Sequence, residues 1–267
     1  MENENTFIEQ AMRIPQLEQL YVAFSAGTRL PFVTCDEEDF TDQIWTFVEE
    51  EKAKHYADVR RENFQDMLVV VKVPKEQMLP FFSSLFAYSI DIIMFQEEER
   101  LTRIPLDKLV KHPDLSKIPE EKRPLLNPQM QLSGIHFMQE MHRRDRNAQA
   151  LHDYEEEMAV NIVRSRFLVP HEVDGDAPLP DGSNIRIPCV KNKEGQMFQP
   201  IFTDGQELVK FDRERKLRAS VIPFENIPKV IGKDVKGIVI NPTSLNIILM
   251  ADKIPALIER FKPDDEQ

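Results

Sequence analysis

The chain has 267 residues, of which 41% are hydrophobic and 30% are charged, and its formal net charge at pH 7 is −12. Such a composition is typical of a folded protein rather than a disordered one, and the length suits one large domain or two of ordinary size. The negative charge argues against a nucleic-acid or anionic-lipid partner, because binding to either depends on lysine and arginine side chains that neutralise phosphates.

Neither a targeting signal nor a membrane span is predicted. The first five residues are acidic rather than basic, and no apolar run of the kind found in a secretory signal follows them. The most apolar stretch, residues 81–94, is shorter than the ~20 residues that a membrane span requires. The two cysteines, Cys35 and Cys189, lie in different halves and do not indicate a disulfide framework. We therefore expect a cytoplasmic protein that does not contact a membrane.

In chain order, the first half begins with a predicted helix over residues 5–18 and a hairpin around a glycine-containing turn at residues 25–28. A long helix is predicted next, over about residues 36–62. Thr34 or Asp36 can cap it, acidic residues fill its first turn, and apolar residues between positions 40 and 48 recur at helical spacing. The other elements predicted here are a helix over residues 74–88, strands over residues 20–24, 30–34, 67–73, 90–95 and 131–137, and a loop over residues 113–124.

The second half begins with a long polar helix over residues 138–164, whose charged side chains are expected to face solvent. A loop rich in proline, glycine and aspartate is predicted over residues 174–183. Further elements are strands over residues 167–173, 184–190, 197–203, 219–224, 237–240 and 245–250, and helices from residue 206 and over residues 225–230 and 251–261. Because hairpins and helical crossovers are mixed in this order, the predicted fold class is α+β (mixed α/β), with helices packed against mixed sheets.

Three short sequences of the first half recur in the second half in the same order. The pairs are residues 31–34 and 200–203, residues 104–109 and 222–227, and residues 125–128 and 239–242. Their spacing agrees only in part, because the first half holds an additional segment between the first two sequences. The shared order predicts an internal duplication. The first unit, residues 1–137, is then divergent and contains an inserted helical segment, and the second unit, residues 138–267, begins with a helix.

Three sequences of the second half carry a resemblance to a known family. They are residues 166–170, a strand that ends in proline; residues 199–208, a strand that turns into a helix; and residues 237–244, a glycine-led strand that ends in Asn-Pro. In this order they resemble the N-terminal domain of the SseB family, over about residues 145–260. The first half resembles that domain only distantly. No reaction is established for the family, so the resemblance implies a fold and no particular chemistry.

Two polar turns of the second half are candidate functional sites: Thr203 with Asp204, and Asn241 with Ser244. Each follows a predicted strand, where loops often carry binding residues, and backbone N–H groups at the start of a helix can bind an anion. The alternative is a purely local role, in which Thr203 or Asp204 caps the helix while Asn241 and Ser244 bond nearby backbone. If both turns lie at one end of the sheet, the four residues form a possible surface for a ligand or a partner.

No motif predicts a catalytic residue, a cofactor or a metal. The six histidines form no pair at metalloprotease spacing, and no cysteine–histidine cluster has zinc spacing. The chain has only eight glycines and lacks a glycine-rich phosphate loop. Cys35 is predicted to lie before a helix, where a nucleophile could lie, but no base accompanies it.

The main hypothesis is a non-enzymatic cytoplasmic binding or interaction module, with a protein partner or a small polar ligand. The alternative is a small-molecule sensor or an enzyme, with a polar pocket formed at the strand ends by Thr203, Asp204, Asn241 and Ser244. A third hypothesis is a self-associating protein, which would present an exposed apolar patch or an unpaired strand edge. The sequence leaves the ligand, the partner and the oligomeric state open.

Overall fold

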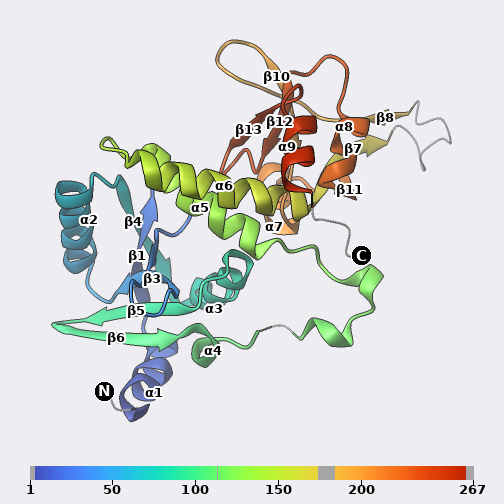
Figure 1. Cartoon of the computed structure of the whole chain (residues 1–267). Coiled ribbons are helices and arrows are strands. Elements are labelled where there is room, and N and C mark those ends of the chain that lie inside the picture. Colours follow the sequence, from blue (N-terminus) through green and yellow to red (C-terminus); the bar gives the residue numbers. More distant parts are fainter. Residues whose placement is uncertain (1–3, 113, 174–183, 263–267) are drawn as a thin grey trace, which may run out of the picture. The chain divides into compact units, whose positions relative to one another are not determined.

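The structure, a computed structural model, describes residues 4–112, 114–173 and 184–262 (Figure 1). Helices and mixed β-sheets form an α+β fold, which confirms the predicted class. The chain divides into two compact units. Unit 1 comprises Met1–Glu121 and Ile135–His152, and unit 2 comprises Lys122–Gly134 and Asp153–Gln267. The predicted boundary between residues 137 and 138 lies inside helix α5 (Pro128–His142), whose first half belongs to unit 2 and whose second half belongs to unit 1.

Unit 1 is built on one mixed sheet with the strand order β4-β1-β3-β5-β6, in which β2 also pairs with β3. Strand β1 is antiparallel to β3 and β4, β3 is parallel to β5, and β5 and β6 form an antiparallel hairpin. The strands are β1 (Gln19–Ser25), β2 (Val33–Cys35), β3 (Asp42–Phe47), β4 (Leu68–Pro74), β5 (Ile92–Glu97) and β6 (Arg100–Pro105). The α-helices of this part of the chain are α1 (Glu4–Arg13), α2 (Glu50–Phe64), α3 (Lys75–Ser84) and α4 (Leu106–Leu109), and short 3₁₀ helices are Ile14–Gln16, Leu85–Tyr88, Leu115–Lys117 and Glu120–Lys122.

Helix α2 is held along the sheet of unit 1 by an aromatic cluster. Ala53 of the helix is fully buried against Tyr21 of β1 and Phe47 of β3. Tyr56, one turn further along, stacks on Trp45 with their ring centroids 4.8 Å apart. Close-packed aromatic pairs of this kind contribute stability beyond the area that they bury. The helix is therefore fixed beside β4, the strand that follows it in the chain.

Two predicted elements of the central region are wrong. The helix predicted over residues 36–62 is interrupted by β3, and α2 begins only at Glu50. Strand β3 lies inside the sheet and is buried on both faces, so its apolar residues show no strand alternation and resemble a helical pattern. The strand predicted over residues 131–137 lies within helix α5, where residues 131–135 are all buried and show no helical period.

Unit 2 contains two sheets, with strand orders β13-β12-β10-β9 and β11-β7-β8, joined by an antiparallel bridge between Leu168 and Phe202. The predicted loop over residues 174–183 lies outside the described residues, and the strand predicted over residues 184–190 is replaced by two short strands. The strands are β7 (Arg166–Val173), β8 (Ile185–Arg186), β9 (Val190–Lys191), β10 (Met197–Ile201), β11 (Arg218–Pro223), β12 (Gly237–Ile240) and β13 (Ile247–Met250). The helices of this part of the chain are α6 (Ala148–Arg164), α7 (Gly205–Phe211), α8 (Ile227–Val230) and α9 (Ile254–Phe261), with a 3₁₀ turn at Phe224–Asn226. The first residues of α6, up to His152, belong to unit 1.

Considered separately, the two units share one strand order. Across the Leu168–Phe202 bridge, unit 2 has the order β11-β7-β10-β12-β13, which matches β4-β1-β3-β5-β6 of unit 1 strand by strand. The directions match as well, because β3–β5 and β10–β12 are the parallel pairs and the other pairs are antiparallel. The repeated sequences do not fall at equivalent places: residues 31–34 reach into β2, whereas residues 200–203 end β10, the counterpart of β3. Strand order, rather than these sequences, supports the predicted duplication.

The described helices bear on the prediction that the chain does not span a membrane. Among them, none combines the length and the apolar composition that crossing a membrane requires. Cys35 and Cys189 are both exposed, and neither takes part in a disulfide. The cytoplasmic location stays a prediction.

Asp91, the residue before β5, is expected to make the stability of the fold depend on pH. Partial burial, and then repulsion from Asp42 and Asp39, raises the pKa of the Asp91 carboxyl above its ordinary value. The folded chain therefore binds this proton more tightly than the unfolded chain does. At pH values above the folded-state pKa, the charged carboxylate lowers the free energy of unfolding. Below the unfolded-state pKa the carboxyl is protonated in both states, and this destabilisation is absent. We expect Asp91→Asn to raise the thermal midpoint at about pH 7 and to leave it unchanged near pH 3. Thermal unfolding at both pH values checks this, and an equal rise at both would contradict it.

Candidate functional site

The four residues predicted at the strand ends of unit 2 lie together. Thr203 and Asp204 follow β10, and Asn241 directly follows β12. These strands are parallel neighbours, with Ile201 paired to Ile240, so their carboxyl ends meet at one edge of the sheet. All four side chains are buried, however: Ser244 is 5% exposed, Asp204 is 2% exposed, and Thr203 and Asn241 are fully buried.

Asn241 connects the two strand ends through its side chain. Its Oδ1 accepts a hydrogen bond from the backbone N–H of Thr203 at 3.1 Å, and its Nδ2 donates to Thr203 Oγ1 at 2.8 Å. Its backbone is left-handed, with φ 48°, a conformation that asparagine tolerates better than most residues. Its carbonyl accepts the N–H groups of Ser244 and Asn246 at 3.0 and 2.9 Å. The turn after β12 is therefore closed by Asn241 itself.

Asp204, rather than Thr203, is the N-cap of helix α7. Its Oδ1 accepts the backbone N–H groups of Gln206 at 2.7 Å and Glu207 at 3.0 Å. Its Oδ2 accepts the Thr203 hydroxyl at 3.0 Å and Gln131 Nε2 at 2.6 Å. The carboxylate thus receives four hydrogen bonds from protein groups.

Two members of this buried polar cluster were not predicted, Gln131 and Glu207. Gln131 comes from the first half of α5 and also accepts a long bond, 3.4 Å, from Asn241 Nδ2. Glu207 is fully buried, accepts the Ser244 hydroxyl at 2.5 Å and pairs with Lys210. We call Gln131, Thr203, Asp204, Glu207, Asn241 and Ser244 the polar cluster. Its members bond to one another, so the arrangement joins β10, β12, α5 and α7, and a ligand could reach it only by breaking these bonds.

Across the described residues, no group of three or more histidine, cysteine, aspartate or glutamate side chains is placed to hold a metal ion. Cys35 ends β2 and is followed by a turn rather than by the predicted helix, and its thiol contacts the Asp36 carbonyl at 3.6 Å.

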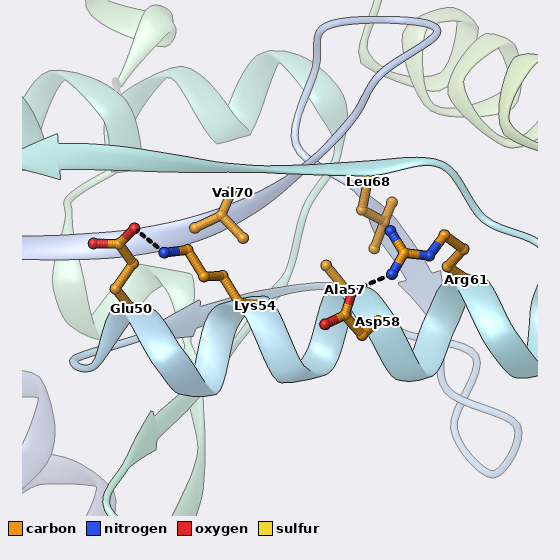
Figure 2. Close-up of a pocket in the computed structure, with 7 residues that line it drawn as sticks. All are labelled: Glu50, Lys54, Ala57, Asp58, Arg61, Leu68 and Val70. Atoms are coloured by element: carbon orange, nitrogen blue, oxygen red, sulfur yellow. Dashed lines mark hydrogen bonds and ion pairs between the residues drawn. The ribbon is translucent and has the colours of Figure 1, made fainter.

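A hollow of about 360 Å³ lies in unit 1, between helix α2 and strand β4. Figure 2 shows charged side chains along one stripe of α2, with Val70 and Leu68 of β4 beside them. We call this hollow the β4 groove, and its lining residues are Glu50, Lys54, Ala57, Asp58, Arg61, Leu68 and Val70. The groove is therefore apolar on its strand side and charged on its helix side.

The charged residues of the groove alternate in sign along the helix. Glu50 and Lys54 form an ion pair at 2.6 Å, and Asp58 pairs with Arg61. Their spacing of three or four residues places all four on one helical stripe. Their side chains are 42–58% exposed, so these pairs contribute little to stability and remain accessible to a partner.

Strand β4 forms an open edge of the sheet, because within the described chain it pairs with β1 alone. Two backbone hydrogen bonds flank the β1–β4 pair: Ala26 N–H donates to the Met67 carbonyl, and Lys75 N–H donates to the Glu18 carbonyl. Hydrogen-bonded and non-hydrogen-bonded residues alternate along an antiparallel pair, so these two bonds define which residues of β4 bond to β1. By that alternation Val69, Val71 and Val73 bond to β1. The backbone N–H and C=O groups of Leu68, Val70 and Lys72 consequently point away from the sheet.

The side chains of this edge strand are apolar apart from Lys72. Met67 and Val69 are 43% and 50% exposed, and Leu68, Val70 and Val71 are half-buried. Natural proteins usually shorten, charge or cover such an edge, because it is a template for pairing with another chain. The sequence predicted a strand over residues 67–73 but could not identify it as an edge.

Residues 146–256 match the family model of the SseB protein N-terminal domain. This segment runs from α6 into α9, so the SseB resemblance predicted for the second half is confirmed there. A search of curated proteins gives no match.

Two solved structures show distant similarity. One is "Anabaena Tic22 (protein transport)", at 9% identity and a TM-score of 0.23, covering 95% of this chain and 98% of that chain. The other is "Tic22 from Plasmodium falciparum", at 9% identity and a TM-score of 0.22, covering 85% of this chain and 88% of that one. Scores this low do not establish a shared fold.

Proposed function

We propose that this protein is a non-enzymatic binding module that associates with an extended polypeptide segment through the open edge of β4. The observation that carries the proposal is the set of outward-facing backbone groups of Leu68, Val70 and Lys72 beside the β4 groove. In strand addition of this kind, main-chain hydrogen bonds supply affinity and neighbouring side-chain pockets supply specificity. Leu68, Val70 and Ala57 would receive apolar side chains, while the α2 stripe would face charged ones.

The SseB match supports a binding role only indirectly, because it identifies a domain in unit 2 and no reaction. The predicted duplication extends the same topology to unit 1, where the open edge lies. We infer that the SseB-like unit 2 keeps its strand ends closed by the polar cluster and that unit 1 carries the contact surface.

The second candidate is a small-molecule sensor or an enzyme acting at the strand ends of unit 2. The position of the polar cluster favours it, because ligands of α/β sheets often bind at the carboxyl ends of parallel strands. The burial and mutual bonding of Thr203, Asp204 and Asn241 oppose it. A ligand at about 100 times its dissociation constant would stabilise the fold by ~2.7 kcal/mol, so a thermal-shift screen separates the two candidates.

Photo-crosslinking in cells that produce the full chain tests the edge directly. A photoreactive p-benzoylphenylalanine in place of Lys72, which is exposed on the edge, is expected to give covalent adducts with protein. The same residue in place of Lys108, which is half exposed on α4, is the matched control and is expected to give none. Equal adducts at both positions, or none at position 72, would contradict the proposal.

Val70→Pro supplies the second arm of this experiment. The Val70 N–H points away from β1, so proline removes an outward donor and leaves the β1–β4 ladder intact. We expect the variant to remain folded by circular dichroism and to lose the adducts at position 72. Val69→Glu, which places a charge on an exposed edge side chain, is the replacement if the proline variant does not fold. Adducts that persist in a folded variant would show that the edge is not the contact surface.

A further inference from the structure

We infer that the segment bound at the β4 edge is the same strand of a second copy of this chain, in a two-fold symmetric dimer. In this dimer the two β4 strands pair antiparallel and the two α2 helices lie side by side. The inference rests on the proposed function, because it names the partner of the same edge.

The charge pattern of α2 is the first argument for a second copy. Along the helix the groove residues Glu50, Lys54, Asp58 and Arg61 carry the signs minus, plus, minus and plus. Read in the opposite direction, the same stripe runs plus, minus, plus, minus. Two α2 stripes placed antiparallel therefore set every acid opposite a base, Lys54 facing Asp58 and Glu50 facing Arg61. A parallel arrangement would set like charges against each other, so the pattern selects an antiparallel copy of itself.

The geometry of unit 1 is the second argument, because one symmetry operation satisfies both the strand and the helix. Residues 65–67 reverse the chain between α2 and β4, and Figure 2 shows Leu68 beside Arg61 and Val70 beside Lys54. Helix and strand thus run in opposite directions along the groove. A two-fold axis perpendicular to the sheet at the β4 edge makes both the β4 strands and the α2 helices antiparallel, with the helices on the same face.

Closure is the third argument. A two-fold interface uses the same patch on both subunits and ends after two copies. It would pair the outward backbone groups of Leu68, Val70 and Lys72 of each chain and cover the apolar side of each β4 groove. The dimer would thereby prevent the apolar β4 edge from pairing with further chains.

Charge reversal at the paired positions tests the inference. Lys54 and Asp58 are 58% and 53% exposed, so Lys54→Glu and Asp58→Lys are expected to leave the fold intact. Each variant alone sets like charges against each other twice in a homodimer, and we expect its dimer to be weaker by roughly tenfold or more in sedimentation velocity. An equimolar mixture of the two variants restores both opposite-charge pairs and is expected to form a heterodimer. The double variant is expected to dimerise like the natural chain.

The control is Lys108→Glu, which reverses a comparably exposed lysine on α4 and is expected to leave dimerisation unchanged. A natural chain that stays monomeric at tens of micromolar overturns the inference, as do single variants that dimerise normally or a mixture that does not recover. The photo-crosslinking result at position 72 then tests the proposed function independently of the dimer. An adduct with a different protein leaves the binding module standing without the dimer, and the absence of any adduct removes both.

Discussion

Asp204→Ala is expected to lower the free energy of unfolding by about 3 kcal/mol or more. The substitution removes the cap of helix α7, worth about 1–2 kcal/mol, and leaves the buried Gln131 amide and Thr203 hydroxyl without their acceptor, at about 1–3 kcal/mol each. Urea unfolding measures the effect as a lower midpoint at an unchanged slope.

The matched control for this prediction is Asp252→Ala. The Asp252 carboxylate is 73% exposed and its ion pair with Lys253 is long, 3.9 Å, so its removal is expected to change stability by less than ~0.5 kcal/mol. A loss of less than about 1 kcal/mol for Asp204→Ala would mean that water can replace the carboxylate. The polar cluster would then be accessible, and the sensor or enzyme hypothesis would gain.

Gly237→Ala is expected to destabilise the protein by about 3 kcal/mol or more. Gly237 begins β12 and is paired with Met250 of β13. A Cβ atom at this position would lie 2.0 Å from the Leu249 carbonyl oxygen and 2.9 Å from Met250 Cα. Because both atoms belong to the backbone, neither can move aside without shifting the strand. Thermal and urea unfolding of the variant measure the loss.

Gly205→Ala is the control for the glycine substitution. Gly205 begins helix α7, and apart from its chain neighbours and the nearby backbone of its own helix, no described atom lies within 4 Å of a Cβ placed there. Its replacement is therefore expected to change stability by less than ~1 kcal/mol in either direction. Equal effects of the two substitutions would mean that β12 and β13 do not approach as closely as the structure shows.

Local chemistry made part of the candidate site predictable. The Asp204 cap follows from a strand that ends in Thr-Asp before a helix, and the convergence of Asp204 with Asn241 follows from two parallel strands ending at one edge. Gln131 could not be predicted, because it lies 73 positions from Asp204 and its surroundings suggested a strand. Long-range partners of this kind leave no local signal in the sequence.

The same limit applies to the fold and to the contact surface. Strand β4 was predicted, over residues 67–73, whereas β3 was missed because burial on both faces removes the alternation that identifies a strand. Whether β4 lies at an edge depends on strand order, which is a property of the whole sheet. The shared strand order of the two units likewise becomes visible only from the topology, since the repeated sequences lie at positions that are not equivalent.

Residue-resolved amide hydrogen exchange of β4 tests the central claim most directly. In dilute protein, the amides of Val69, Val71 and Val73 are expected to be protected by β1, and those of Leu68, Val70 and Lys72 are expected to exchange rapidly. Raising the protein concentration into the range of the dimer should protect the three outward amides and leave the inward ones unchanged. Outward amides already protected in dilute protein, or exchanging rapidly at every concentration, would contradict the account.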